Sequence, residues 1–446
     1  MTKQQKELLS ERTNEHVYHC AKCGLCLDAC PVYKELLVES ASPRGKVQLA
    51  KHIIEGDLEI SKKMEDILFS QCLLCGSCVI ACPSGVKQNE LFSGLRWRTA
   101  QRHGMPLAKK LFFQVLSRRW LMSTSSWFGK WVRKIFSGPA IESRIEVGNL
   151  PVSAIPPLND KPFNAAYPEI VMPEDEIRAR ILYFHGCATN YVFADVGKAV
   201  VSVLTNMGVQ VEIPRGQSCC GLPIFLSGDR KTAIRCITEA LGLFARDDVD
   251  AVIVDCATCG SALRHEYAHI LRELKDLGED VSEDMIEKAQ LLQSKVRDVS
   301  EYVAAHMDWL AAMPSRDGAR KIRVAYHDPC HLMKGQGVTM QPRTILKSIP
   351  SVEYVEMEKA GTCCGGGGEF QIEFGDTSAL ITNRKIGYIH DANAQILATG
   401  CPGCNITIRA HLDKNKNMQV LHTIQVLQKS IDGTLDNFID SGITAD

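Results

Sequence analysis

The residues of this chain best suited to chemistry are its cysteines. Of the 19 cysteines in 446 residues, all but Cys236 fall into four groups with regular spacing. The first two groups share the pattern C-x2-C-x2-C-x3-C-P: Cys20, Cys23, Cys26 and Cys30 before Pro31, and Cys72, Cys75, Cys78 and Cys82 before Pro83. Thiolate sulfur is a soft ligand for iron and zinc. Because thiols stay reduced in a chain that is not exported, we expect metal or redox chemistry rather than disulfides.

The trailing Cys-Pro of each run predicts an exchange of ligands between two clusters. In two-cluster ferredoxins the fourth cysteine of one run binds the cluster held by the other run. We therefore expect one [4Fe-4S] cluster on Cys20, Cys23, Cys26 and Cys82. A second [4Fe-4S] cluster is expected on Cys72, Cys75, Cys78 and Cys30. Zinc is the alternative, but C-x2-C zinc sites draw four ligands from two separated pairs rather than from a run of four.

The third and fourth groups repeat a different pattern, a lone cysteine, then Cys-Cys-Gly, then C-x2-C. Their members are Cys187, Cys219, Cys220, Cys256 and Cys259, and then Cys330, Cys363, Cys364, Cys401 and Cys404. The intervals are 31 and 35 residues in the third group and 32 and 36 in the fourth. The matched spacing predicts that five thiolates converge at strand ends in each repeat.

Five soft ligands are more than tetrahedral zinc needs, so an iron-sulfur species is favoured at each repeat. Two alternatives remain open, a pair of structural zinc sites or a redox-active vicinal dithiol. The run from Gly365 to Gly368 would let the backbone approach the sulfur atoms and supply N–H donors, which is one way to tune a reduction potential.

Three histidines and one further cysteine lie near these groups. His185 precedes Cys187 by two residues, and His327 and His331 flank Cys330. Histidine replaces cysteine at some clusters, but we favour hydrogen-bond donors to the ligands, or plain loop residues. Cys236 fits no motif and is interpreted as a small buried residue.

The elements that must position these groups change type along the chain. Short helices are expected between the first two groups. From about residue 176, β-branched runs such as ILYFHG, VQVEI and AVIVDC alternate with helical stretches, which predicts parallel βαβ units. The alternation starts again near Arg323, so the second half is an internal repeat.

A basic and aromatic stretch separates the two halves. Residues 101–141 contain no Asp or Glu. The basic residues are Arg102, Lys109, Lys110, Arg118, Arg119, Lys130, Arg133 and Lys134, and the aromatic ones include Phe112, Phe113, Trp120, Trp127, Phe128 and Trp131. Such a stretch suits an anionic membrane interface. Packing of the aromatics on other domains or on a partner subunit is equally compatible with the pattern.

Composition and absent motifs narrow the function. The formal net charge of −1 gives no global reason to expect nucleic-acid binding. The N-terminus is polar, so we expect no export signal. No apolar run is long enough for a membrane-spanning helix, so we expect none. No G-x-G-x2-G, P-loop or G-x-S-x-G motif is found. Removing hydride from a substrate would therefore need another chain.

The order of these motifs resembles a known family. The third and fourth groups look like the cysteine-rich CCG domains of heterodisulfide reductases. Two ferredoxin motifs followed by two CCG domains resemble the iron-sulfur subunits of glycolate oxidase and of related lactate dehydrogenases. Pro43-Arg44-Gly45-Lys46 and Cys82-Pro83-Ser84-Gly85-Val86 are further matching segments. The resemblance implies a subunit that accepts electrons from an FAD-containing 2-hydroxyacid dehydrogenase subunit and passes them towards quinone.

Motifs and resemblance together predict an α+β protein, with an α-helical two-cluster ferredoxin domain followed by two α/β CCG repeats. The expected boundaries are 1–100 for the ferredoxin domain, 101–175 for a basic, aromatic and then proline-rich linker, 176–315 for the first CCG domain and 316–446 for the second. The expected cofactors are two [4Fe-4S] clusters and further iron-sulfur clusters in the CCG domains.

The leading hypothesis is an electron-transfer subunit of a glycolate or lactate dehydrogenase, with no catalytic residue of its own. We expect it in the cytoplasm, with contact to the inner face of the cell membrane as an open alternative. Two other functions remain. The chain could be a heterodisulfide-reductase-like catalytic subunit that reduces a disulfide, or an iron-sulfur subunit of a membrane respiratory complex.

Overall fold

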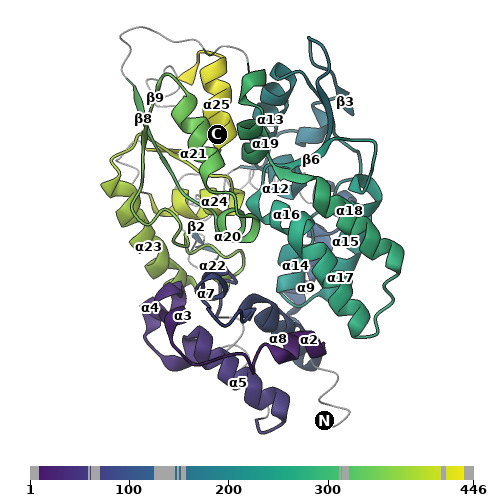
Figure 1. Cartoon of the computed structure of the whole chain (residues 1–446), viewed down its shortest axis with the longest axis vertical. Coiled ribbons are helices and arrows are strands. Elements are labelled where there is room, and N and C mark those ends of the chain that lie inside the picture. Colours follow the sequence, from purple (N-terminus) through teal and green to yellow (C-terminus); the bar gives the residue numbers. More distant parts are fainter. Residues whose placement is uncertain are drawn as a thin grey trace.

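The computed structural model describes residues 10–58, 61, 71–124, 146–147, 150–151, 157–310, 313, 321–412 and 418–435. Within these residues the chain forms a helical N-terminal domain and two sheet-containing domains (Figure 1). The helical domain lies at the bottom of Figure 1, and the two sheet domains stand above it. The predicted α+β fold class, helical domain first and two α/β repeats after it, is confirmed.

The N-terminal domain is built of short helices in its described part. These are α2 (Glu11–Glu15), α3 (Leu25–Ala29), α4 (Pro31–Leu36), α5 (Pro43–Glu55), α7 (Ser77–Ile80) and α8 (Gln88–His103). Local sequence sets the ends of α5: Ser42 Oγ accepts the Gly45 N–H (2.9 Å), and Gly56 ends the helix in the left-handed region (φ 87°). Val47 and Ile53 on α5 pack against Leu91 on α8, which gives the domain its own core.

The first sheet domain has the strand order β3-β5-β4-β6-β7. The strands are β3 (Ile170–Val171), β4 (Ala179–Phe184), β5 (Val209–Glu212), β6 (Ala251–Val254) and β7 (Val296–Asp298). All neighbours are parallel except β3, which pairs antiparallel with β5 at the edge. The helices between them are α12 (Gly186–Tyr191), α13 (Ala194–Asn206), α14 (Leu222–Leu226), α15 (Arg230–Phe244), α16 (Ala257–Ser261), α17 (Tyr267–Asp276) and α18 (Glu283–Lys295), followed by α19 (Val299–Ala305).

The second sheet domain repeats this topology. Its order is β11-β10-β8-β9, with all neighbours parallel. The strands are β8 (Ile322–Tyr326), β9 (Val352–Val355), β10 (Ile396–Ala398) and β11 (Gln419–Leu421), and the helices are α20 (Cys330–Gln336), α21 (Met340–Ser348), α22 (Phe370–Glu373), α23 (Gly375–Asp391), α24 (Pro402–His411) and α25 (Thr423–Ile431). Leaving β3 aside, each sheet places its first strand between its second and third. The predicted repeat of parallel βαβ units is confirmed.

The two sheet domains share one apolar core. Helix α13 of the first domain packs against α25 of the second, and α19 of the first packs against α21 of the second. In each pair, a helix that connects the first two parallel strands of one domain packs against the last helix of the other domain. The contact therefore has the reciprocal character of a twofold interface. Val200, Leu204, Leu346 and Leu427 are among its fully buried side chains.

The helical domain docks on both sheet domains. Towards the second domain, Glu35 pairs with Arg384 (3.0 Å), and Lys334 Nζ donates a hydrogen bond to Ser77 Oγ (2.5 Å). Towards the first domain, the buried Glu273 carboxylate on α17 accepts the Ser10 N–H (3.0 Å) and the Thr13 hydroxyl (2.9 Å).

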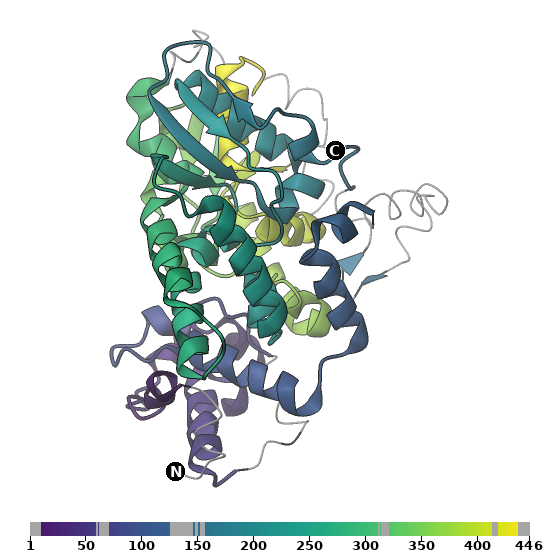
Figure 2. The same cartoon turned by 90° about the vertical axis from the view of Figure 1, so that its right-hand side faces the viewer.

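The region expected to be a linker carries some regular structure. Helix α9 (Leu107–Leu116) buries Phe113 in the core of the first sheet domain, and Gln114 donates to Thr232 on α15 (3.0 Å). Figure 2 shows α8 and α9 leading the chain out of the helical domain and up along the sheet domains. A short ribbon of β1 (Glu146–Val147) and β2 (Leu150–Pro151) follows. The domain boundaries given above stay predictions.

Glu273 offers a test of how the helical domain is held. Replacing it with alanine leaves the Ser10 and Thr13 donors without their acceptor, which costs about 1–3 kcal/mol for buried groups. We expect Glu273→Ala to speed native-state proteolysis around residues 10–16, measured by timed digestion and mass spectrometry. Asp276→Ala on the same helix is the matched control, because its ion pair with Arg12 is solvent-exposed and worth at most about 1 kcal/mol. Equal digestion rates for both variants would contradict this role of Glu273.

Candidate metal centres

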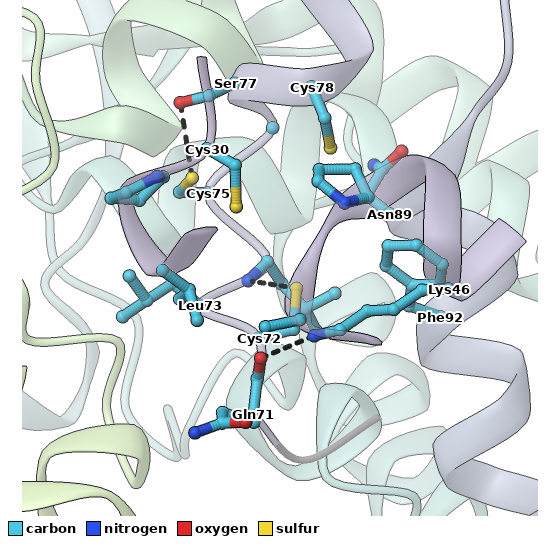
Figure 3. A pocket seen from close by; sticks show the side chains of 16 residues that line it. Cys30, Lys46, Gln71, Cys72, Leu73, Cys75, Ser77, Cys78, Asn89 and Phe92 are labelled. Atoms are coloured by element: carbon cyan, nitrogen blue, oxygen red, sulfur yellow. Dashed lines mark hydrogen bonds between the residues drawn. The ribbon is translucent and has the colours of Figure 1, made fainter. Parts of the chain in front are cut away.

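One pocket gathers cysteines from both N-terminal motifs. It is lined by Cys30 of the first motif and by Cys72, Cys75 and Cys78 of the second (Figure 3). Backbone N–H groups already point at two of these sulfur atoms: Tyr33 N donates to Cys30 Sγ (3.4 Å), and Leu74 N donates to Cys72 Sγ (3.5 Å). The pocket thus brings the fourth cysteine of the first motif beside three cysteines of the second, and the exchange of ligands between clusters stays a prediction.

Glycines shape both N-terminal motifs in the same way. Gly24 (φ 86°) and Gly76 (φ 71°) each stand between the second and third cysteine of a run and adopt the left-handed conformation before a short helix. This conformation is strained for residues with a side chain. The turn lets the third cysteine of each run, Cys26 or Cys78, start a helical turn close to the second.

The remaining N-terminal cysteines lie near one another as well. Cys20 and Cys82, which belong to different motifs, pack against the same apolar cluster of the helical domain. Burial raises the pKa of Cys26, and the neighbouring Cys20 and Cys23 thiols add to the rise. Helix α3, which carries Cys26, packs against α7, which carries Cys78.

In the first sheet domain, the five cysteines of the third group meet at the carboxyl ends of the strands. Cys187 follows β4, Cys219 and Cys220 lie between β5 and α14, and Cys256 and Cys259 follow β6. Gly221 is left-handed (φ 78°) and its N–H donates to Cys219 Sγ (3.4 Å). Hydrogen bonds from Cys219 and then Cys259 lower the pKa of Cys220 to about 6, so these thiols are in direct contact.

The fourth group has the same layout in the second domain. Cys330 begins α20, Cys363 and Cys364 follow β9, and Cys401 and Cys404 follow β10. The sulfur atoms of Cys364 and Cys404 are 3.3 Å apart. Gly365 is left-handed (φ 89°) and its N–H donates to Cys363 Sγ (3.4 Å), as Gly221 does in the first domain.

The second motif and the fourth group touch across a domain boundary. Hydrogen bonds from Cys330 and Cys363 lower the pKa of Cys75 well below its usual value. Cys30 and Cys75 pack against the same apolar cluster that contains Cys363. The Lys334 ammonium, one helical turn after Cys330, bonds Ser77 beside them. Thiols of the helical domain therefore meet thiols of the second sheet domain.

Glycine also permits this close approach. A Cβ atom on Gly367, in the loop after Cys364, would lie 2.4 Å from Leu73 of the helical domain. Such a separation is far below van der Waals contact. The glycine run predicted to bring backbone near the sulfur atoms thus also lets the helical domain approach the fourth group.

The donor set fits iron-sulfur binding. Burial raises the pKa of Cys30 to about 12 and that of Cys78 well above its usual value, because buried thiolates lack solvation. Bound metal cations supply the charge that makes such thiolates stable. Two buried lysines lie near the sulfur atoms: Lys46 bonds the Gln71 carbonyl (2.5 Å) and Lys385 bonds the Ala360 carbonyl (2.8 Å).

Sequence reasoning missed these lysines as partners of the thiols. Lys46 belongs to the Pro43–Lys46 segment, which was singled out only for its family resemblance. A Cβ atom on Gly45 in that segment would lie 2.1 Å from the Glu39 carbonyl oxygen, so glycine is required there. Lys334 and Lys385 stand in ordinary helical stretches, and nothing in their spacing marks them.

A second pocket lies where the three domains meet. It is lined by Cys75 and Glu90 of the helical domain, by Glu266 of the first sheet domain, and by Cys330 and His331 of the second. His331 therefore faces a cavity beside the thiols. Cys236 is fully buried in the core of the first domain, as expected of a small apolar residue.

The basic, aromatic stretch divides between core and surface. Phe113 is buried, whereas Leu107, Leu111, Phe112 and Trp120 are exposed. Lys109 forms ion pairs with Glu369 and Glu373 of the second sheet domain. Trp127, Phe128, Lys130, Trp131, Arg133 and Lys134 lie outside the described residues. None of the described helices combines the length and apolar character needed to cross a membrane.

Comparison with known proteins agrees with this architecture. Residues 16–86 match the family described as 4Fe-4S dicluster domain, and residues 181–264 and 324–409 each match the cysteine-rich domain CCG. The "Probable glycolate oxidase iron-sulfur subunit" of Bacillus subtilis is 28% identical over 432 residues, which cover 92% of this chain and 93% of that protein.

Two further relatives are similar. One of the subunits of the fumarate reductase (CoM/CoB) of Methanothermobacter marburgensis is 30% identical over 414 residues, which cover 92% of this chain and 71% of that protein. Lactate utilization protein A 2 of Bacillus cereus is 26% identical over 256 residues, 56% of this chain and 99% of that protein. The chain thus belongs to the family of oxidoreductase iron-sulfur subunits in which a 4Fe-4S dicluster domain precedes two CCG domains, the family of the glycolate oxidase iron-sulfur subunit.

Proposed function

We propose that this chain is the electron-transfer subunit of a flavin-dependent 2-hydroxyacid dehydrogenase acting on glycolate or lactate. It would relay electrons from an FAD-containing partner towards quinone or another carrier. The observation that carries the proposal is the junction of Cys75 with Cys330 and Cys363, which joins the dicluster domain to the second CCG domain. The chain would not oxidise the substrate alone, since its sequence has no recognisable flavin or nicotinamide motif.

The proposed ligand sets are those that the sequence motifs predict. One [4Fe-4S] cluster would be held by Cys72, Cys75, Cys78 and Cys30. This assignment is supported by the pocket that these four cysteines line together. The other cluster would be held by Cys20, Cys23, Cys26 and Cys82. The five cysteines of each CCG domain would hold further iron-sulfur clusters. Bound clusters of this kind accept and release single electrons, at potentials that depend on charge, hydrogen bonds and exposure.

The residues around Cys75 suit an electron path. Leu73, Cys363 and Phe370 are buried together at the junction. Lys334 places a positive charge there, held by its bond to Ser77. A cation beside a thiolate-bound centre favours the reduced form, because reduction adds negative charge. The second CCG domain would therefore be the one that exchanges electrons with the dicluster domain.

The relatives support a partner subunit of this kind. One is named as a glycolate oxidase iron-sulfur subunit and another as a lactate utilization protein. Glycolate and lactate are both 2-hydroxyacids, and removing hydride from them requires a cofactor such as flavin. A heterodisulfide-reductase-like role is the second candidate, favoured by the similarity to a component of a CoM/CoB fumarate reductase. Disulfide-dependent oxidation of a reduced dye by the isolated chain would favour that second role.

Contact with a membrane surface forms part of the proposal. The exposed Leu107 and Leu111 stand four residues apart, on one face of α9, with Phe112 beside them. Lys110, Arg118 and Arg119 are exposed nearby. Apolar side chains flanked by cations suit an anionic lipid interface.

Cys75 tests the relay. We expect Cys75→Ser, assayed with the flavin partner, to abolish reduction of the natural acceptor by the 2-hydroxyacid. Dye reduction by the partner should continue, because the substrate site lies on the other chain. Cys236→Ser is the matched control, since that thiol belongs to no motif, and it should keep full coupled turnover. Coupled turnover that survives in Cys75→Ser would rule out a relay through this junction.

Vesicle binding tests the membrane contact. We expect the chain to sediment with phosphatidylglycerol vesicles more than with phosphatidylcholine vesicles, and less so as salt is added. Leu111→Glu should weaken binding about tenfold or more, because losing the burial of one leucine costs about 2 kcal/mol. Leu380→Glu, on the exposed face of α23, is the control. Identical binding by the two variants would exclude α9 as the contact.

A further inference from the structure

His327, directly after β8, faces the thiols of the second CCG domain. The imidazole is fully buried, and neither ring nitrogen has a nitrogen or oxygen hydrogen-bond partner within the part of the chain that the structure describes. A ring nitrogen of His327 and the sulfur atoms of Cys364 and Cys404 all lie within 4.8 Å of one another. Cys401 is in contact with Cys404. The imidazole and two thiols thus form one compact donor group, with Cys401 beside it.

An imidazole in this position needs a partner. Leaving a buried polar group without a hydrogen bond costs about 1–3 kcal/mol. The adjacent Asp328 does not serve, since its carboxylate oxygens bind Arg343 instead (2.8 and 2.7 Å). Lys385, also buried nearby, donates to the carbonyls of Lys359 and Ala360. The thiols remain as the groups that the ring faces, and a metal bound to them would give it a partner.

The first CCG domain provides an internal comparison. His185 occupies the same place, directly after β4, the strand equivalent to β8. There, Nδ1 bonds the Gly186 carbonyl (2.8 Å), and the ring packs edge-on against Phe163 (5.5 Å) and Tyr183 (6.2 Å). His185 therefore lies among aromatic rings, whereas His327 lies among thiols. Equivalent positions in the two repeats have different surroundings.

We propose that His327 is a metal ligand of the second CCG domain, binding iron through a ring nitrogen beside Cys364 and Cys404. The sequence favoured an indirect role for this histidine, and its burial beside the sulfur atoms of Cys364 and Cys404 argues for a direct one. An imidazole is neutral where a thiolate is negative, and histidine ligands raise the potential of iron-sulfur centres. The second CCG domain would then hold electrons more readily than the first. The inference concerns this site alone and does not depend on which partner or substrate the chain serves.

Nitrogen coupling tests this ligand directly. The full-length chain, purified anaerobically with its clusters and labelled with 15N-histidine, would be examined by pulsed EPR in the redox state that makes the second CCG centre paramagnetic. We expect a 15N coupling as strong as that of a directly bonded nitrogen. It should vanish in His327→Ala and persist in His185→Ala, the matched control from the other repeat.

Further variants separate ligation from a structural role. His327→Cys offers a thiolate in place of the imidazole, so it should keep the iron content of the wild type while losing the nitrogen coupling. Its midpoint potential should fall below that of the wild type. A coupling that is absent in the wild type, or that survives in both His327 variants, would overturn the proposal. So would zinc bound at this site, detected as zinc lost selectively from His327→Ala.

Discussion

The cost of burying thiolates away from water is the constraint on which the rest of the structure depends. A thiolate removed from water loses its solvation, so a buried thiol stays protonated unless a positive charge is near. The raised pKa values of Cys30 and Cys78 express this cost. Gathering four or five such groups in one place becomes favourable when metal cations are bound. The chain must therefore form sites that are crowded with sulfur and ready for metal at the same time.

The fold meets this constraint with rigid backbone. In each sheet domain, parallel strands bring the cysteines of distant segments to one edge, because the carboxyl ends of the strands lie together. Left-handed glycines after the vicinal pairs, Gly221 and Gly365, turn an N–H group towards the preceding sulfur. In the helical domain, Gly24 and Gly76 perform a similar turn. The N–H groups of Gly221 and Gly365 stabilise negative charge on sulfur without adding side-chain charges.

The two repeats share a topology but differ in what surrounds their sulfur atoms. The second has the helical domain against it, with Cys75 and Lys334 at the junction and His327 within the thiol group. In the first repeat, aromatic rings surround His185, the histidine equivalent to His327. Charge and ligand type tune the potential of an iron-sulfur centre. A duplicated domain thus provides two sites of similar shape and different electrostatics, which an electron path needs if it is to have a direction.

The sequence by itself determined the local features. The spacing of Cys20 to Cys30 and of Cys72 to Cys82 predicts two motifs. The alternation of β-branched and helical stretches, which starts again near Arg323, predicts a repeat of parallel βαβ units. Both predictions could be made from the sequence because they depend only on residues close together in the chain or on a pattern that recurs along it. The surroundings of His185 and His327 could not be read in this way, although both follow the first strand of a repeat.

Only the tertiary structure decided which residues meet across domain boundaries. It placed Cys75 against Cys330 and Cys363, and Lys334 against Ser77. These contacts join residues more than 250 positions apart, and no local pattern encodes them. Backbone periodicity follows from the chain's own dihedral preferences, whereas the charge and solvation of a sulfur atom depend on every segment packed around it. The sequence therefore identified the candidate ligands, and the packing of the domains decided how their sites differ.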